Sequence, residues 1–454
     1  MRGDRGRPIS VFGRAAAALA VAGLTVAGCT SGGLGSPDTH RGSRSGSPSA
    51  PGSPFDAGSP SASTSQPAAE PVRLQITPAT GDRAVRPDHA VTVVAVGGTL
   101  TSVSVRGAGA ELPGRFDAQR QRWTSASALH VASRYTVTAT GTSEAGPVVT
   151  TTSVFRTLSP VQTLRAEVAE NAGATYGVGM PIQVSFNRPI ADKATVERAL
   201  HVTTSQPVVG AWYWTDDQDV TFRPRDYWPA HTTVTVRAAL NGVRAAAGLY
   251  GRADVTRSFR IGTSLIVTAS TATHRLHLYR DGKLLHNWPI STGKPGDDTP
   301  NGTYLTIEKA SPVRMRPADI APGQPGYYDL EVPWSVRITW SGIYLHDAWW
   351  SVDQQGHINV SHGCVNLPPA AAESYYKMSV PGDPVTITGS PVSGNSGDGW
   401  TDWFHSWTYL LAHSALHEAV MAGPAGSRFV LSSAVPASIA TAPLGRPVPG
   451  NSAS

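Results

Sequence analysis

Apolar and polar residues alternate along most of the chain, and this pattern predicts β-strands rather than helices. Short turn clusters such as Gly81-Asp82 and Gly97-Gly98 separate the alternating runs. Glycine and aspartate favour turns because they tolerate backbone angles that strands do not use. The sequence therefore predicts a mainly β protein. The clearest runs lie at residues 89–96, 134–139, 182–186, 233–237, 264–269, 275–279 and 383–387.

Two successive segments, residues 71–158 and 159–263, share one layout of strands and turns. Each also carries a glycine and aromatic stretch ahead of its last clear strand. Tandem segments of about 100 residues with this pattern are typical of immunoglobulin-like β-sandwiches, although neither has the Cys…Trp…Cys spacing of antibody domains. We therefore expect two such domains acting as a spacer, with binding by exposed aromatic residues as the alternative.

A third strand-rich segment spans residues 264–390 and is expected to be the catalytic domain. Within it, Asp281-Gly282 lies between two strand-like runs and predicts a two-residue hairpin turn. Residues 370–377 predict one short helix.

Residues 391–424 are rich in tryptophan and leucine and predict a small C-terminal subdomain. The spacing of the apolar residues after Trp403 fits an amphipathic helix, which we expect to pack against the catalytic domain. A membrane-surface or partner helix is the alternative, but the polar face lacks the Lys and Arg that anionic lipid favours. Residues 425–454 are expected to be a flexible tail.

Residues 1–28 have the features of a lipoprotein signal peptide: a basic start and then an apolar stretch of small residues, too short for a lasting membrane span. The stretch ends at Cys29 in a sequence that resembles the bacterial lipobox, where the signal is cut before a lipidated cysteine. We expect Cys29 to hold the chain at the outer face of the cell membrane, with residues 29–70 as a Ser/Gly/Pro-rich tether reaching into the cell wall. An ordinary signal peptide with a chance cysteine is the alternative.

The composition of the chain excludes several classes of protein. The chain has 454 residues, of which 40% are hydrophobic and 15% charged, so it can build real cores. Its net charge is +5, without a basic stripe, which makes nucleic acid an unexpected partner. The chain has 2 cysteines, which excludes a disulfide-rich scaffold and a four-cysteine zinc site. Once Cys29 is lipidated, Cys364 is the remaining thiol.

The candidate chemistry lies around Cys364, in the run Ser-His-Gly-Cys-Val-Asn at residues 361–366. A cysteine nucleophile needs a base and donors for the oxyanion that forms. His346, 18 residues upstream, ends a strand-like run and is a candidate base. His362 would share a face with the thiol if both lay on a strand. Gly363 would let its own N–H and that of Cys364 face a substrate oxygen.

Three other interpretations of the same residues remain open. The cysteine could be a buried structural residue, or it could bind zinc together with His346 and His362, although no tight pair spacing is present. Ser361 could be the nucleophile, but it lacks a G-x-S-x-G context. Asn366 is expected to brace the loop.

His346, a gap of 14 residues and then the run at 361–366 resemble the signature of the L,D-transpeptidases, whose catalytic domain is called YkuD-type. The flanks, Ser-Gly-Ile-Tyr-Leu at residues 341–345 and Leu-Pro at 367–368, agree with it. The whole layout resembles the mycobacterial-type lipoprotein members with two immunoglobulin-like domains. The resemblance covers residues 71–421.

The resemblance implies a two-step acyl transfer. Cys364 would attack the carbonyl of the third stem residue of peptidoglycan, a diaminopimelate, and expel the fourth residue, D-Ala. The side-chain amine of a neighbouring diaminopimelate would then resolve the thioester and give a 3→3 cross-link. His346 would be the base and hold the thiolate as an ion pair, oriented by a backbone carbonyl. His362 would lie on the substrate side, and Gly363 would help to hold the oxyanion.

The resemblance also implies a set of substrate-binding residues. At two places this sequence differs from the family's pattern. A lid tyrosine assists in the family, and here either Tyr327 or Tyr328 is in place for it. Asp347 stands where a small residue is expected, and its carboxylate would raise the basicity of His346. The pair at residues 349–350 departs from the family's Pro-Trp pairing. The residues assigned to substrate binding are Tyr327, Tyr328, Met315, Ser361, Asn366 and Trp350, with Trp340 as a further cleft residue.

The expected partners are donor tetrapeptide stems and acceptor diaminopimelate, with carbapenems as inhibitors and with no cofactor or metal. Water as the acceptor would make the chain an L,D-carboxypeptidase. Two other classes remain as alternatives: a wall-binding scaffold with a spent catalytic domain, and a zinc hydrolase.

Overall fold

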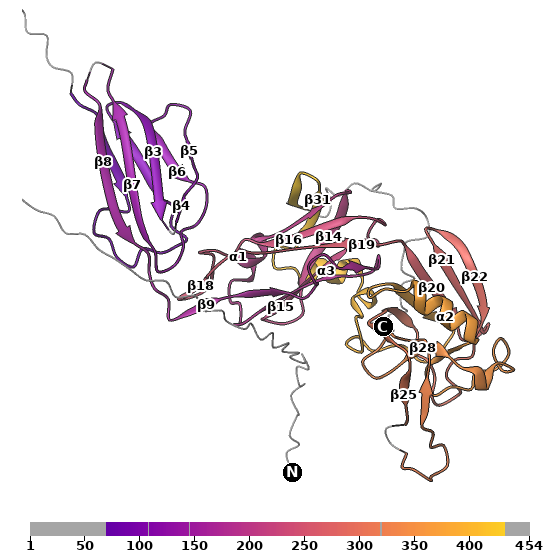
Figure 1. Ribbon diagram of the computed structural model, residues 1–454. Helices are drawn as coiled ribbons and strands as arrows, with labels where there is room; N and C mark the ends of the chain where they lie inside the picture. The colour runs from indigo at the N-terminus through magenta and orange to yellow at the C-terminus, as the bar shows by residue number, and fades with distance from the viewer. Residues whose placement is uncertain (1–69, 108, 145, 318–319, 432–454) are drawn as a thin grey trace, which may run out of the picture. The chain divides into compact units, whose positions relative to one another are not determined.

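The computed structural model describes residues 70–107, 109–144, 146–317 and 320–431 (Figure 1). The predicted signal peptide, Cys29, the tether up to residue 69 and the chain after residue 431 lie outside the described residues. The protein is mainly β, as the alternating pattern predicts. No helix in the described part of the chain is long and apolar enough to cross a membrane.

The first sandwich consists of two four-stranded sheets, in the orders β1-β2-β6-β5 and β4-β3-β7-β8. Alternate residues of β7 are buried, for example Tyr135 and Val137, because one face of each sheet covers a shared core around Trp123. The strands are β1 (Arg73–Thr77), β2 (Thr92–Val96), β3 (Thr99–Gly107), β4 (Ala110–Glu111), β5 (Gly114–Phe116), β6 (Arg122–Ser125), β7 (Arg134–Thr142) and β8 (Val149–Arg156).

The second sandwich pairs a six-stranded sheet, β10-β12-β15-β14-β31-β32, with a four-stranded sheet, β11-β19-β16-β13. A small third sheet, β17-β18-β9, and the short helix α1 (Lys193–Arg198) accompany them. The other strands are β9 (Gln162–Leu164), β10 (Ala166–Val168), β11 (Thr175–Tyr176), β12 (Ile182–Phe186), β13 (Leu200–Thr204), β14 (Val208–Trp214), β15 (Asp219–Pro224), β16 (Thr233–Ala238), β17 (Arg244–Ala246), β18 (Leu249–Gly251) and β19 (Val255–Ile261).

Two strands of the six-stranded sheet, β31 (Ala419–Gly423) and β32 (Gly426–Val430), come from the C-terminal region. β31 pairs antiparallel with β14, in register Val208 to Ala422. β32 therefore corrects the expectation of a loose segment from residue 425. Local patterns did not predict β32, because a five-residue strand containing glycine and serine gains its order from cross-strand pairing rather than from propensity.

The catalytic domain has a five-stranded sheet, β22-β21-β20-β30-β23, a four-stranded sheet, β24-β27-β28-β29, and a β25-β26 hairpin. Its elements are β20 (Leu265–Ser270), β21 (Arg275–Arg280), β22 (Lys283–Pro289), β23 (Gly302–Leu305), β24 (Glu308–Ala310), β25 (Val313–Met315), β26 (Leu330–Val332), β27 (Ser335–Arg337), β28 (Tyr344–Asp347), η1 (Trp349–Ser351), β29 (Val365–Leu367), α2 (Pro369–Met378) and β30 (Pro384–Thr388).

Two local predictions in this domain are confirmed. Asp281 and Gly282 have φ of 48° and 78°, the positive values of a tight hairpin turn, and they join β21 to β22. The short helix predicted at 370–377 is α2. It packs its alanines and Tyr375 on the catalytic core, against β27 and β28.

The C-terminal helix packs differently from the prediction. α3 (Trp407–His413) lies on β14 of the second sandwich, with Leu410 against Ala211 and Tyr213. Just before it, η2 (Asp402–Phe404) sends Trp403 into the core of that sandwich. The apolar face of the helix was recognised, but the sequence pattern does not say which apolar surface covers it.

Buried polar contacts hold this C-terminal segment in place. The Tyr213 hydroxyl donates to the Asp402 carboxylate, and Arg223 Nη1 donates to the carbonyl of Asp402 at 2.9 Å. Trp403 Nε1 donates to the carbonyl of Gly179 at 2.8 Å. Because these donors and acceptors are buried, separating the two segments would leave them without partners.

Candidate active site

The pairing of β28 with β29 brings the predicted base, on β28, and the predicted nucleophile, just before β29, to neighbouring segments of the chain. The two strands are parallel, with Leu345 opposite Val365 and His346 opposite Asn366. Leu345 and Val365 are fully buried in the catalytic core. Successive side chains point to opposite faces of a strand, so His346 projects away from that core. Cys364 directly precedes β29.

The Cys364 thiol is half-buried at this edge. The backbone N–H of Tyr344 points at Sγ from 3.4 Å, and the thiol donates to the carbonyl of Gly342 at 3.6 Å. Both contacts come from the residues just before His346. The strand that carries the base therefore also orients the sulfur.

The imidazole of His346 is held by a backbone oxygen. Its Nδ1 lies 2.7 Å from the carbonyl oxygen of Asp347, which can only accept a hydrogen bond, so Nδ1 carries the proton. Nε2 is then unprotonated and available as a base. The Trp350 ring stacks on the imidazole with centroids 5.8 Å apart, and His346 is 3% exposed.

Burial opposes the ion pair that the family resemblance implies. It lowers the pKa of His346 to about 4, even though the hydrogen bond to Asp347 acts in the opposite direction. It also raises the pKa of the Cys364 thiol to about 11, against the N–H of Tyr344. Each shift favours the neutral form at neutral pH. The resting site therefore holds a thiol beside a neutral imidazole.

Asp347 acts on the histidine through its carbonyl rather than its carboxylate. The residue pairs with Leu367, so its side chain points to the core face, opposite to His346. The carboxyl group is 6% exposed, its Oδ1 has no hydrogen-bond partner among the described residues, and burial raises its pKa. The expected carboxylate effect on the basicity of His346 is therefore not supported.

Residues 361–364 form a bend, and β29 begins only at Val365. The expectation that His362 and Cys364 share a strand face is therefore wrong. Gly363 has φ of +116°, which side chains disfavour, and this explains the glycine in the bend. The Thr299 hydroxyl donates to the Gly363 carbonyl at 2.8 Å and fixes the bend from the neighbouring loop.

Two groups that were expected to meet the substrate, the Ser361 hydroxyl and the Gly363 N–H, form hydrogen bonds within the bend instead. Ser361 Oγ donates to the carbonyl of Cys364 at 2.6 Å and accepts from the N–H of Gly363 at 3.1 Å. The Gly363 N–H is thus already bonded, contrary to its expected role as a free oxyanion donor. Ser361 is 7% exposed, so the structure places its hydroxyl in the bend and not in the cleft.

Asn366 lies beneath the site and braces it. It is 2% exposed, and its Nδ2 donates to Ser351 Oγ at 2.9 Å. The contact joins β29 to η1, the turn that carries Trp350. Asn366 thereby supports the wall beside His346, as a brace rather than a substrate contact.

The structure separates the two candidate lid tyrosines. Tyr328 packs on the His362 ring with centroids 5.2 Å apart. Burial raises the pKa of Tyr328, and the nearby Cys364 and Asp297 raise it further. Tyr327 instead directs its hydroxyl at Asp329, at 3.4 Å. Of the two residues, Tyr328 faces the thiol.

Met315 lies on the hairpin that carries these tyrosines. It pairs with Leu330 across β25 and β26. Arg314 and Asp329 form an ion pair of 2.6 Å on the same hairpin. Met315 thus lies on the same hairpin as the two tyrosines, and no described contact joins it to Cys364.

Three exposed tryptophans lie on the catalytic domain, and one of them, Trp350, contacts His346. Trp349 and Trp350 are 50% and 43% exposed and form an edge-to-face pair at 4.6 Å. Trp340 is 47% exposed and contacts Trp400 edge to face at 6.3 Å. Trp350 therefore covers one side of the His346 ring, and Trp349 packs against Trp350.

Sequence reasoning missed one loop at the site, residues 293–299 between β22 and β23. Lys294 Nζ lies 2.8 Å from His362 Nε2 and 3.1 Å from Asp297 Oδ2. The backbone N–H of Lys294 also donates to the carbonyl of Ser361 at 2.9 Å. A polar Gly-Lys-Pro-Gly-Asp-Asp-Thr turn gave no signal of its own, because only the folded chain brings it against the cysteine motif.

The described residues contain no group of three or more His, Cys, Asp or Glu side chains that could hold a metal ion. His346, His362 and Cys364, the set considered for zinc, are thus not gathered as ligands.

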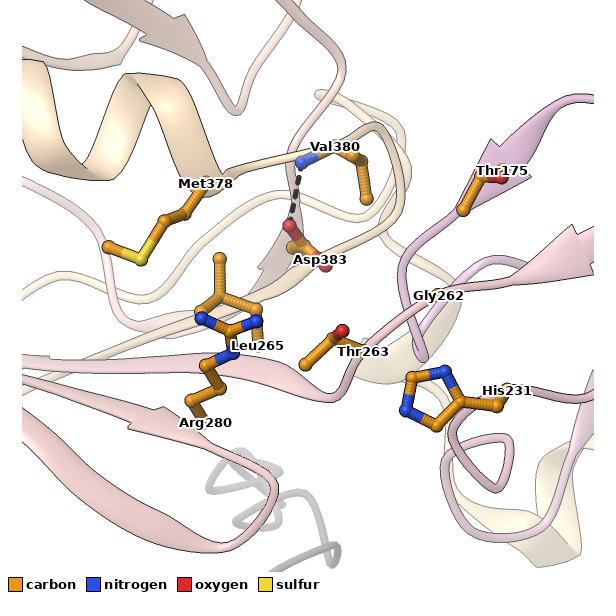
Figure 2. A pocket seen from close by; sticks show the side chains of 9 residues that line it. All are labelled: Thr175, His231, Gly262, Thr263, Leu265, Arg280, Met378, Val380 and Asp383. Carbon is orange, nitrogen blue, oxygen red and sulfur yellow. Dashed lines mark hydrogen bonds between the residues drawn. The ribbon is translucent and has the colours of Figure 1, made fainter.

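A separate cavity of about 290 Å³ lies between β19 of the second sandwich and the catalytic domain (Figure 2). The Val380 N–H donates to Asp383 Oδ2 beside it, at 2.8 Å. Its lining contains neither Cys364 nor His346, so it is not the candidate active site. The lining residues are Thr175, His231, Gly262, Thr263, Leu265, Arg280, Met378, Val380 and Asp383.

Fold and site together define a β-rich enzyme domain that brings a thiol and an imidazole to neighbouring segments of the chain, carried by immunoglobulin-like modules. Residues 264–387 match the L,D-transpeptidase catalytic domain, and residues 82–244 match the bacterial Ig domain. L,D-transpeptidase 5 of Mycobacterium tuberculosis is 35% identical over 76% of this chain and 77% of its own length. L,D-transpeptidase 2 of the same species is 33% identical over 72% of this chain and 81% of its own length.

A solved structure of an L,D-transpeptidase in complex with imipenem is also similar. It is 35% identical, covers 50% of this chain and all of its own length, and has a TM-score of 0.43. On the family matches and the two mycobacterial relatives, the chain belongs to the L,D-transpeptidase family. It is an acyltransferase that cross-links peptidoglycan and works outside the cytoplasm, where that polymer lies.

Proposed function

We propose that Cys364 is the nucleophile of this L,D-transpeptidase and that Nε2 of His346 is its base. The observation that carries the proposal is the hydrogen bond from Nδ1 of His346 to the Asp347 carbonyl, which leaves Nε2 of the neutral ring free. The contacts of Cys364 Sγ with Tyr344 and Gly342 support it, because they hold the sulfur beside the strand that carries His346. Geometry of this kind is the first requirement for a nucleophile and its base.

In the first step, Sγ attacks the carbonyl carbon of the donor's diaminopimelate while its proton passes to Nε2 of His346. The C–N bond to D-Ala then breaks, and Nε2 returns the proton to the leaving amine. Because burial disfavours both ions, proton transfer accompanies the attack and does not precede it. The product of this step is a thioester on Cys364.

In the second step, the neutral side-chain amine of an acceptor diaminopimelate attacks the thioester carbon. The amine gives a proton to Nε2, the C–S bond breaks, and the proton passes to Sγ. A 3→3 cross-link is released and the thiol is restored. Water in place of the amine would give a tripeptide, the carboxypeptidase product.

We assign the donation to the developing oxyanion to the Tyr328 hydroxyl and the backbone N–H of Cys364. Burial and neighbouring groups raise the pKa of Tyr328, so its hydroxyl keeps its proton at neutral pH and acts as a donor. The N–H of Gly363 contributes indirectly, because its bond to Ser361 fixes the bend.

The test is product analysis with a disaccharide-tetrapeptide substrate and the purified chain. Mass spectrometry should show a cross-linked dimer with loss of D-Ala, and Cys364→Ser should abolish both. Tripeptide without dimer would make the chain a carboxypeptidase. The absence of either product would leave the scaffold interpretation.

The relative with bound imipenem supports a second test. We propose that carbapenems acylate Cys364, because their strained lactam carbonyl is an electrophile for the same thiol. Intact-mass analysis should show one adduct per chain, lost in Cys364→Ser. An adduct that persists in this variant would contradict the assignment.

We also propose lipid anchoring at Cys29, which the apolar stretch and the lipobox-like sequence support. Cells that express the chain and are fed a radiolabelled fatty acid should label it, and Cys29→Ala should remove the label. Equal labelling of the variant would overturn the anchor, but it would not affect the proposed reaction.

A further inference from the structure

The loop at residues 293–299 brings two opposite charges to the edge of the active site. Lys294 and Asp297 form an ion pair of 3.1 Å, and their side chains are 42% and 40% exposed. Both charged groups are thus partly open to solvent and available to a ligand. An exposed ion pair of this kind contributes little to stability, typically about 0–1 kcal/mol.

Contacts with the cysteine motif fix this pair in place. Lys294 Nζ lies 2.8 Å from Nε2 of His362, and the Lys294 backbone N–H donates to Ser361. An ammonium group can only donate, so Nε2 of His362 accepts and the ring is neutral, with its proton on Nδ1. His362 therefore adds no positive charge beside Lys294.

Asp297 borders the bend that carries the thiol. Its backbone carbonyl borders Gly363, where an added Cβ would lie 3.8 Å from that oxygen. Tyr328, which packs on His362, is close enough to both Asp297 and Cys364 for each to act on its hydroxyl. A ligand group bound at Asp297 would thus lie next to the position of the thioester.

We propose that the Lys294–Asp297 pair binds the zwitterionic end of the acceptor's diaminopimelate side chain, with Lys294 taking the carboxylate and Asp297 the ammonium. This inference rests on the proposed function. The end of that side chain carries both charges on one carbon, and the pair offers the two opposite charges at a matching separation. The same end holds the amine that must attack the thioester.

Recognition then leads directly to reaction. The bound ammonium releases one proton to solvent, and the neutral amine attacks the thioester carbon. Its second proton passes through Nε2 of His346 to the sulfur. Binding by the pair raises the local concentration of the amine over that of water, which favours cross-linking over hydrolysis.

The experiment measures how the acyl-enzyme divides between acceptor and water. A disaccharide-tetrapeptide serves as donor, and an isotope-labelled tripeptide, which has no fourth residue to expel, serves as acceptor in excess. The ratio of mixed cross-link to hydrolysed donor should fall about two- to fivefold in Asp297→Asn, the range for loss of a partly exposed charge contact. An unchanged ratio would overturn the inference.

Matched variants distinguish the loss of acceptor binding from a general disturbance of the loop. Asp298→Asn removes a neighbouring carboxylate that accepts from Gly296 and does not contact Lys294. It should leave the ratio unchanged, and an equal fall would point to the net charge of the loop and overturn the inference. Lys294→Arg keeps the charge and should keep the ratio within about twofold, whereas Lys294→Met should lower it.

A second acceptor tests each charge separately. When the acceptor carboxylate is replaced by a carboxamide, Lys294→Met should no longer affect the ratio, whereas Asp297→Asn still should. Equal sensitivity of both acceptors to Lys294→Met would overturn the assignment of Lys294. If the unmodified chain forms no cross-link at all, the proposed function itself fails. If it forms cross-links, and if neither substitution changes the ratio of cross-link to hydrolysed donor, only this inference fails.

Discussion

The Nδ1 nitrogen of His346 lies 2.7 Å from the carbonyl oxygen of its own neighbour, Asp347. A backbone group thus does what a carboxylate does in many catalytic triads: it fixes the tautomer and the direction of the imidazole. The Asp347 side chain turns to the opposite face of the strand. The identity of that side chain should therefore matter little to the chemistry.

His346→Ala should slow acylation of Cys364 by a carbapenem about 10²- to 10⁴-fold, the usual contribution of a positioned general base. Asp347→Asn is the matched control and should change the rate less than about twofold, because it keeps the backbone carbonyl. Both rates can be followed by intact-mass spectrometry. A large loss of rate in Asp347→Asn would show that the carboxylate takes part after all.

The neutral thiol predicts a characteristic pH profile. Because burial raises the pKa of Cys364 to about 11, the thiolate fraction grows over the whole range from neutral to alkaline pH. The rate of alkylation by iodoacetamide should therefore rise about tenfold per pH unit between about pH 7 and 9, since the thiolate is the reactive form. A rate that is already level below about pH 8 would indicate a preformed ion pair with His346.

Tyr328→Phe should slow acylation about 10²-fold, the order of magnitude for loss of one oxyanion donor. Tyr327→Phe removes the same atom from the neighbouring residue and should have almost no effect, because that hydroxyl points at Asp329. Stopped-flow measurement of carbapenem acylation compares the two variants. The reverse order of effects would assign the lid role to Tyr327.

Glu170, in the second sandwich, should make stability depend on pH. It is 1% exposed, and burial raises its pKa from 4.5 to about 8. The folded chain thus keeps a proton that the unfolded chain has released, so its contribution to stability is full below about pH 4.5 and is lost as the pH rises through about 8.

Glu170→Gln keeps a neutral side chain of the same size at every pH. The melting temperature of the unmodified chain, compared with that of the variant, should therefore fall across this range, by the equivalent of a few kcal/mol in the free energy of unfolding. Melting curves at several pH values give the comparison. Parallel pH profiles of the two proteins would show that Glu170 is ionised in the folded state.

The sequence predicted much of the fold and of the reactive pair. Alternation along the strands and the Asp281-Gly282 turn follow from local rules, which the structure obeys. The cysteine motif and His346 could be found because their spacing is a recognisable signature. Their position on neighbouring segments depends on the pairing of β28 with β29, which local patterns do not determine.

The features of the site that could not be predicted from the sequence depend on contacts between segments far apart in the chain. Tyr327 and Tyr328 have the same chemistry, and only the packing of the hairpin decides which one meets His362. The Gly363 N–H is engaged because the bend brings Ser361 back upon it. Lys294 is 68 residues from His362, and no local pattern joins the two.

β31 completes the six-stranded sheet of the second sandwich by pairing with β14. The polypeptide thus leaves that sandwich at β19, builds the whole catalytic domain, and comes back to finish the module it left. The second sandwich and the catalytic domain therefore depend on each other. A fragment that stops after β30 exposes the backbone edge of β14. A catalytic domain cut out by itself loses the C-terminal segment that joins it to the second sandwich. A fragment of this enzyme that is meant to fold by itself should therefore contain the second sandwich, the catalytic domain and the C-terminal strands together.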